Sequence, residues 1–156
     1  MEDLCKPSDQ LLVFPFKRSW SAALTLCSAH GGLVYTPDNE EENNELTKTL
    51  EPFNDKCADP VSGNLAWLGI KSKNYKWYKI GEESKLTEQN FTSWKVGAPY
   101  FESYECGFTT VGGIWFSALN CNIKMKLCTV CKITGGLNSN NLFIRYPCSD
   151  IKRHLQ

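Results

Sequence analysis

The distribution of hydrophobic and polar positions predicts a strand and then a helix near the start of the chain. Residues 11–16 form an apolar run that we interpret as a strand, and Pro15 favours an edge position because proline cannot donate to a ladder. Ser19 is a good N-cap for the next segment. Apolar side chains then recur on one helix face at Trp20, Ala23, Leu24 and Cys27. Gly31 and Gly32 end this helix, so Cys27 is expected to point toward the core.

A second helix is predicted to begin with Thr36 as its N-cap and Pro37 at the first helical position. Its first turn is crowded with acids, which the helix dipole favours there: Asp38, Glu40, Glu41 and Glu42. These acids lack the alternating oxygen spacing and the glycine of a calcium loop, so we interpret them as a solvated helix start. The buried side of the helix is supplied by Leu46, Leu50 and Phe53.

After the second helix the pattern changes from helical to strand-like. Residues 54–64 predict a polar loop, residues 65–70 a buried central strand, and residues 76–80 a second strand. Between residues 82 and 104 little is regular, and a loop this long inside a compact domain is usually functional. Residues 125–133 predict a further strand.

A glycine pair predicts a hairpin between the long loop and the last of these strands. Aromatic and β-branched residues flank Gly112 and Gly113 on both sides, and glycine takes positive φ without steric cost. Cys106 and Cys121 enclose the hairpin, and we expect a disulfide between them to tie the strands just beyond the turn. The motif predicts a rigid, exposed loop platform that carries the function.

Length and charge exclude several classes of protein. The 156 residues favour one domain with a real core, and 17 Lys and Arg balance 17 Asp and Glu. This balance argues against a nucleic-acid binder, and no lysine run suggests attraction to anionic lipid. No apolar run reaches the ~18 residues of a membrane span. The composition changes after residue 133, so we expect a domain over 1–133 and an extension over 134–156, in which residues 142–148 resemble one more edge strand.

Eight cysteines indicate a disulfide framework formed in an oxidising compartment. The alternative is zinc, since Cys128 and Cys131 have CxxC spacing, but no second CxxC exists and His30 and His154 stand alone. A redox-active pair would be expected at the start of a helix, whereas this one lies in a strand-like run. Disulfides are therefore the better interpretation.

The ordered set of motifs resembles the C-type lectin-like domain. Residues 20–27 and the glycines that follow resemble the family's first helix and turn, and residues 67–70 resemble its WIGL core strand. Residues 97–100, Cys106, Trp115 and Cys121 follow the order of its long-loop half. The match spans about residues 10–133. The resemblance implies an α+β fold, with two helices packed on antiparallel sheets, a long loop region and stabilising disulfides.

The resemblance also implies disulfide partners. In the family, one bridge corresponds to Cys106–Cys121, and a second joins Cys27 to a cysteine of the final strand. Cys131 and Cys128 compete for that place, and only one can meet Cys27 because residues three apart on a strand face opposite sides. Residues 130–132 resemble the family's closing tripeptide, which favours Cys131. Further bridges would then form among the spare strand cysteine, Cys5, Cys57 and Cys148.

The family's calcium ligands are largely replaced in this chain. Its Glu-Pro-Asn motif corresponds here to Ala98, Pro99 and Tyr100, and its Trp-Asn-Asp motif to residues 115–117, which read Trp-Phe-Ser. Glu105 is the one remaining ligand candidate, and calcium needs six to eight oxygens. We therefore predict no metal and no other cofactor.

Aromatic and charged side chains take the place of the ligands on the long loop and hairpin. Such a composition is typical of a protein-binding hot spot, and the candidate contacts are Lys95, Tyr100, Phe101, Glu102, Tyr104 and Phe116. Trp94 and Trp115 are expected in the core. The sequence thus predicts an extracellular recognition module, secreted or at the cell surface, that binds a protein without calcium.

The same residues bear on two other functions and on one modification. Carbohydrate binding, with calcium or by aromatic stacking, is the alternative to protein binding. Catalysis is not expected, because no His-paired Ser or Cys and no convergent carboxylates are found. Asn90 begins an Asn-Phe-Thr sequon and is a candidate glycosylation site.

Overall fold

The computed structural model describes residues 11–98 and 105–133 in full, together with the backbone of Leu4, Cys5, Tyr146 and Pro147. Several residues singled out in the sequence lie outside this part of the chain: Pro99, Tyr100, Phe101, Glu102, Tyr104 and Cys148, as does the side chain of Cys5.

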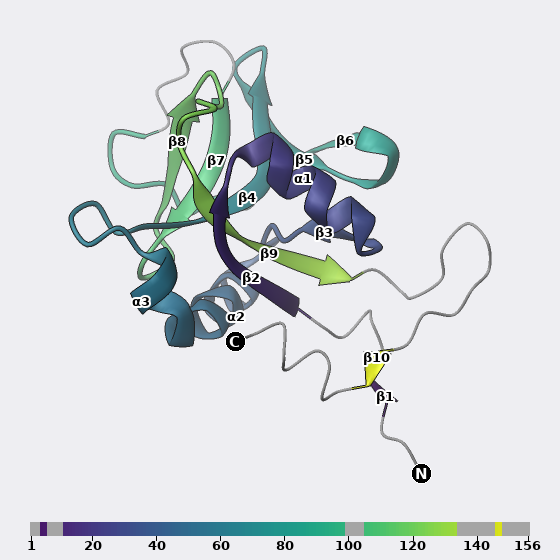
Figure 1. Cartoon of the computed structure of the whole chain (residues 1–156). Coiled ribbons are helices and arrows are strands. Elements are labelled where there is room, and N and C mark those ends of the chain that lie inside the picture. The colour runs from purple at the N-terminus through teal and green to yellow at the C-terminus, as the bar shows by residue number, and fades with distance from the viewer. Residues whose placement is uncertain (1–3, 6–10, 99–104, 134–145, 148–156) are drawn as a thin grey trace.

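The helices lie in the first part of the described chain, and strands dominate from residue 64 onward (Figure 1). The helices are α1 (Trp20–Ala29), α2 (Glu40–Leu50) and α3 (Asn54–Cys57), with short 3₁₀ turns η2 (Glu51–Phe53) and η3 (Glu82–Ser84). The strands are β1 (Leu4–Cys5), β2 (Leu11–Arg18), β3 (Gly32–Val34), β4 (Asn64–Lys73), β5 (Lys76–Ile80), β6 (Leu86–Glu88), β7 (Glu105–Thr110), β8 (Trp115–Leu119), β9 (Leu127–Ile133) and β10 (Tyr146–Pro147).

Strands β9 and β4 join the two halves of the main sheet. β9 pairs antiparallel with β2 and β3, and it meets β4 in parallel through Ala66 and Cys128. β4 pairs antiparallel with β5 and β7, and the sheet continues from β5 to β6 and from β7 to β8. Separately, β1 pairs with β10. The predicted two helices on antiparallel sheets are confirmed.

The first strand and helix follow the sequence prediction. The β2–β9 register shifts between Phe14 and Arg18, which accommodates Pro15 on a strand whose described partner is β9. Ser19 caps α1, since its Oγ accepts from the Ala22 amide at 3.3 Å. Gly31 after the helix has φ 75°, which suits glycine.

The prediction that α2 is capped by Thr36 is wrong. The helix begins at Glu40, and Asn39 is its N-cap, because the Asn39 Oδ1 accepts from the Glu42 amide at 2.8 Å. The buried Thr36 Oγ1 instead accepts from the Gly69 amide of β4 at 2.8 Å. A buried amide needs an acceptor, and this long-range bond outweighs the local capping role.

Two segments predicted to be irregular contain secondary structure. Residues 54–57 continue the second helical region as α3, with Cys57 fully buried. Residues 86–88 form β6, which pairs with β5 through Lys79 and Thr87 among others. A three-residue strand is too short to show a sequence period.

The hairpin turn is confirmed, but the place of its disulfide is not. Gly112 and Gly113 have φ values of 94° and 82°, as the turn requires. Cys106 lies opposite Ala118, at the end of the ladder away from the turn, so the bridge does not tie the strands just beyond it. The turn contacts α2, because the Asn43 Nδ2 donates to the Gly113 carbonyl at 2.9 Å.

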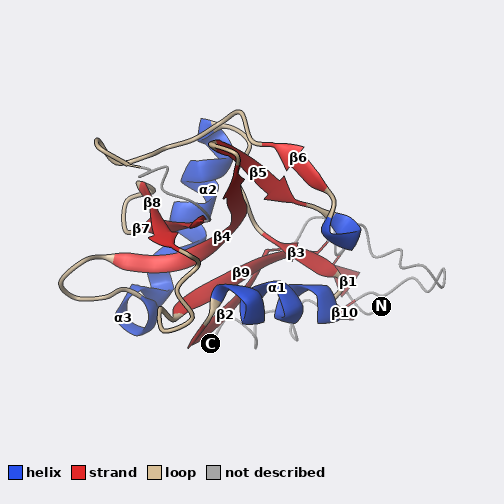
Figure 2. Cartoon of the chain, turned by 90° about the horizontal axis from the view of Figure 1, so that it is seen from above, coloured by secondary structure: helices blue, strands red, loops and turns tan. Residues whose placement is uncertain are grey.

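Alternate residues of the central strands face two separate cores. Leu12 and Cys131 belong to a core that α1 covers, whereas Val13 and Cys128 belong to a core that α2 covers. Figure 2 shows α1 and α2 on opposite sides of β9. The predicted opposite orientation of Cys128 and Cys131 is therefore confirmed.

Each core contains one disulfide that ends on β9. Cys27 of α1 pairs with Cys131 at a Cα distance of 5.3 Å, as predicted, and Cys57 pairs with Cys128 at 5.7 Å. The third bridge, Cys106–Cys121, was also predicted correctly.

Candidate functional site

The last described residues of the long loop run alongside β8. The Trp115 amide donates to the Ser93 carbonyl at 2.7 Å, and the Lys95 amide donates to the Trp115 carbonyl at 2.9 Å. These bonds hold the described part of the loop against the hairpin. We call residues 93–98 together with Phe116 the long-loop face.

An aromatic cluster supports this face from below. The Trp94 ring lies 4.7 Å from Trp77 and 5.8 Å from Trp115 between centroids, and Phe91 lies 5.6 Å from Trp115. Trp115 is fully buried, and its Nε1 donates to the Asn43 Oδ1 at 2.9 Å. Trp115 is therefore a core residue, as predicted, and Trp94 packs against the same core.

Two of the predicted contact residues lie together. Lys95 is exposed, and its Nζ lies 5.3 Å from the centroid of the partly buried Phe116 ring. Phe116 stacks in turn on Phe108, with centroids 6.1 Å apart. The other four predicted contacts, Tyr100, Phe101, Glu102 and Tyr104, lie outside the described residues.

Exposed apolar side chains near this face were not singled out from the sequence. Val96 is 98% exposed, Leu119 is 49% exposed, and Ile123, in the connection after β8, is 71% exposed. Large apolar residues inside polar segments were the available signal. Single exposed apolar residues are common, and Val96 is the one of these three that belongs to the long-loop face.

Glu105 does not form part of a calcium-like ligand set among the described residues. Its side chain is fully buried, and its Oε1 accepts from the Ser117 Oγ at 2.9 Å. The Glu105 amide donates to the Ser72 Oγ, also at 2.9 Å. The described part of the chain brings no three acidic, histidine or cysteine side chains together as a metal site. One carboxylate and a phenylalanine do not fit calcium, which requires at least six oxygens.

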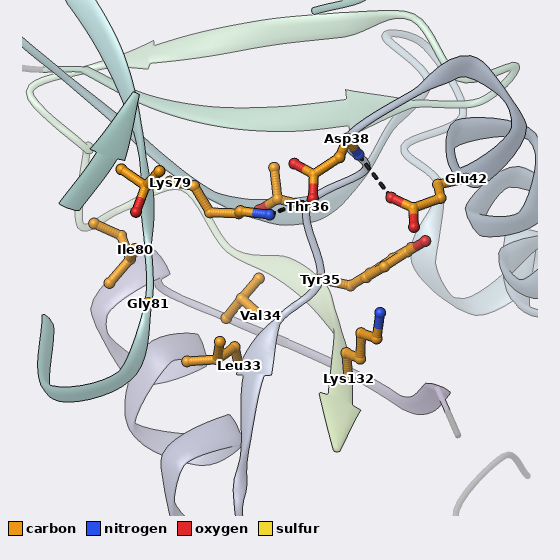
Figure 3. A pocket seen from close by; sticks show the side chains of 11 residues that line it. Leu33, Val34, Tyr35, Thr36, Asp38, Glu42, Lys79, Ile80, Gly81 and Lys132 are labelled. Atoms are coloured by element: carbon orange, nitrogen blue, oxygen red, sulfur yellow. Dashed lines mark hydrogen bonds and ion pairs between the residues drawn. The ribbon is translucent and has the colours of Figure 1, made fainter. Parts of the chain in front are cut away.

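A cavity of about 100 Å³ lies where parts of β3, α2, β5, β6 and β9 meet (Figure 3). It is lined by residues from five separate segments: Leu33, Val34, Tyr35, Thr36, Asp38, Glu42, Lys79, Ile80, Gly81, Thr87 and Lys132. No single stretch of sequence signals it, because only the fold brings these segments together.

Charged side chains are fixed around this cavity. The Lys79 Nζ and the Asp38 Oδ2 form an ion pair at 2.5 Å, and the Asp38 amide donates to the Glu42 Oε1 at 2.8 Å. The Lys132 Nζ lies 5.8 Å from the centroid of the Tyr35 ring. Burial, together with the negative charges of Glu42, Glu45 and Asp38, raises the pKa of the Tyr35 hydroxyl well above its usual value.

Neither region offers a catalytic arrangement within the described residues. All cysteines in that part of the chain are in disulfides. His30 contacts the Phe14 ring at 4.9 Å, and its Nδ1 lies 3.0 Å from the Leu26 carbonyl. The described helices include none that is both long and apolar enough to cross a membrane.

The two-helix α+β fold, the long loop and the three bridges define a disulfide-stabilised lectin-type domain. The model of the family described as "Lectin C-type domain" matches residues 16–133, which is well over half of the chain. The chain therefore belongs to the C-type lectin domain family, whose members are typically extracellular and generally not enzymes.

Solved structures support the fold at low sequence identity. Human lithostathine is 18% identical, with a TM-score of 0.62 over 80% of this chain and 90% of its own. The type II antifreeze protein of herring is 16% identical, with a TM-score of 0.59 over 78% of this chain and 87% of its own. The carbohydrate-recognition domain of the mouse scavenger receptor C-type lectin is 16% identical, with a TM-score of 0.55 over 74% of this chain and 80% of its own. The search of curated proteins found no match.

Proposed function

We propose that the chain is an extracellular recognition module that binds a protein partner without calcium through the long-loop face. The observation that carries this proposal is the state of the family's calcium-ligand positions. Phe116 lies under the Lys95 ammonium, and Ser117 donates to the buried Glu105. The Ser117–Glu105 pair is buried, so the surface here is formed by the exposed Lys95 and the partly buried Phe116.

The described surface has the composition of a protein contact. The exposed apolar Val96 follows the exposed Lys95, whose ammonium lies over the partly buried Phe116 ring. A rigid aromatic base reduces the entropy lost when such a face binds. Tyr100, Phe101, Glu102 and Tyr104 remain predicted contacts, and the module is proposed to span residues 1–133, with 134–156 as an extension.

The calcium part of the proposal is tested by titrating calcium into the oxidised chain in a calorimeter and by melting it with and without a chelator. We expect no heat of binding and an unchanged melting temperature. Micromolar binding would contradict calcium independence, and replacing Glu105 by glutamine would then show whether this carboxylate is a ligand.

The proposed binding to a protein is tested by probing an array of immobilised cell-surface ectodomains with labelled multimers of the chain. For any partner found, K95E combined with V96D should weaken binding by more than about tenfold, because a central charge and an apolar contact are both lost. The control K56E changes an exposed lysine on α3 and should bind normally. Equal loss in the control would mean that net charge, not this face, controls binding.

Carbohydrate binding is the second candidate, because the fold also occurs in a mouse carbohydrate-recognition domain. A glycan array probed with and without calcium distinguishes the two. Saturable binding to a sugar that K95E and V96D abolish would replace the protein proposal.

We also propose that Asn90 carries a glycan. Asn90 and Thr92 are exposed, while the neighbouring Gln89 is buried and its Nε2 donates to the Pro37 carbonyl at 2.9 Å. Secretion from eukaryotic cells should give a heavier species that amidase treatment reduces in mass, and T92A should abolish the difference. A wild-type mass that amidase treatment leaves unchanged would contradict this proposal.

A further inference from the structure

The cavity beside α2 has an apolar floor and a charged rim. The floor is made of Val34 and Ile80, which are 3% and 9% exposed, and of the half-buried Leu33. The rim includes Asp38 and Glu42, which come from the start of α2 and the segment before it. The helix dipole explains acids at this position, and the cavity makes them accessible to another molecule.

The walls of the cavity are held by long-range bonds. The Tyr35 amide donates to the Val130 carbonyl at 2.8 Å, and the Thr36 Oγ1 accepts from the Gly69 amide at 2.8 Å. The Gln89 Nε2 donates to the Pro37 carbonyl at 2.9 Å. A guest therefore meets a preorganised site and does not need to order the wall.

The size of the cavity restricts its guest to a single side chain. Pockets for free small molecules usually measure about 300–1,000 Å³, and this one measures about 100 Å³. The apolar floor suits an aliphatic stem, and the rim suits a polar head. Lysine and arginine combine these two parts, because their stems lie on apolar surface while their heads stay with charges.

The rim carries two acids and two lysines, and Glu42 is the acid that has no ion-pair partner among the described residues. Lys79 neutralises Asp38, whereas Glu42 uses one oxygen for the Asp38 amide and keeps a full negative charge beside the Tyr35 hydroxyl (Figure 3). Burial is the main cause of the raised pKa of Tyr35, and the negative charges of Glu42, Glu45 and Asp38 add to it. Lys132 lies on the ring of Tyr35.

We propose that this cavity receives one lysine or arginine side chain of a basic protein segment, with its stem on Val34 and Ile80 and its head beside Glu42. The site shares no residue with the long-loop face, so a failed test of either proposal leaves the other unaffected. It gives the module a second contact, selective for cationic partners.

The test uses the whole oxidised chain and a capped pentapeptide with arginine between alanines, followed by NMR. Millimolar peptide should shift the amide signals of Tyr35, Asp38 and Glu42. The same peptide with citrulline, which keeps the shape but lacks the charge, should bind at least about threefold more weakly, as expected for a partly exposed ion pair.

Two matched variants separate the site from general charge effects. E42Q keeps an oxygen for the Asp38 amide but removes the charge, so it should bind both peptides equally. E41Q removes an exposed charge from the same turn of α2 and should retain the preference for arginine. Each of three results would overturn the proposal. The peptide could leave the amide signals at the cavity unshifted, the wild type could bind the citrulline peptide as tightly as the arginine peptide, or it could bind a glutamate peptide more tightly than either.

Discussion

Glu105 and Ser117 form a buried hydrogen bond within the hairpin. The Glu105 carboxylate is fully buried. Its Oε2 has no hydrogen-bond partner, and its Oε1 accepts from the Ser117 hydroxyl. A buried polar group without a partner is costly. Ser117 is therefore a structural donor to the buried Glu105.

S117A should lower the free energy of unfolding by about 1–3 kcal/mol, because it leaves the buried carboxylate without this donor. Urea unfolding of the oxidised chain measures the loss. The control S28A removes an exposed hydroxyl on α1 and should change stability by less than about 0.5 kcal/mol. Equal stability of S117A and wild type would show that water replaces the hydroxyl.

Tyr35 should make the chain less stable in alkaline solution. Burial and neighbouring carboxylates raise the folded-state pKa of its hydroxyl above the usual value of about 10. Above that pH the unfolded chain loses the proton while the folded chain keeps it, so stability falls as the pH rises. Y35F lacks this group and should lose less stability than wild type between about pH 9 and 11 in urea unfolding. Parallel curves of stability against pH for Y35F and wild type would contradict the raised pKa of Tyr35.

At the scale of elements, local patterns predicted most helices and strands but not every boundary. The periodic face of α1 and the apolar run of β4 are strong local signals, and both elements form as expected. Thr36 has the right chemistry for a cap, yet it binds Gly69. That bond joins residues 33 positions apart, so no local pattern could reveal it.

The cap correction has a direct test. N39A removes the side chain that accepts from the Glu42 amide and should cost about 0.5–2 kcal/mol in thermal or urea unfolding. N44A changes an exposed asparagine inside the same helix and serves as the control. If N44A costs as much as N39A, helix propensity and not capping explains the loss.

At the scale of the whole molecule, the sequence predicted the framework better than the surface. Two of the three bridges between described residues were predicted from family resemblance, and the opposite faces of Cys128 and Cys131 followed from strand geometry. The Cys57–Cys128 bridge was left open, because several pairings fitted the count equally well. The cavity was not predicted, since five segments meet there only after folding.

Replacing both Cys57 and Cys128 by alanine should cost about 2–5 kcal/mol, because the bridge closes a sequence separation of 71 residues in the unfolded chain. The corresponding change at Cys106 and Cys121, separated by 15 residues, should cost less. Urea unfolding of the two double variants gives the comparison. The reverse order would mean that local packing, not loop closure, controls the loss.

The position of β9 has a consequence for biosynthesis. This strand pairs with β2, β3 and β4 and carries the partners of both Cys27 and Cys57, yet it is among the last described segments to leave the ribosome. Until it emerges, Cys27 and Cys57 have no correct partner, and an oxidising lumen can join them to each other. We therefore expect the yield of oxidative folding to depend on how fast early bridges are exchanged, as well as on the final stability.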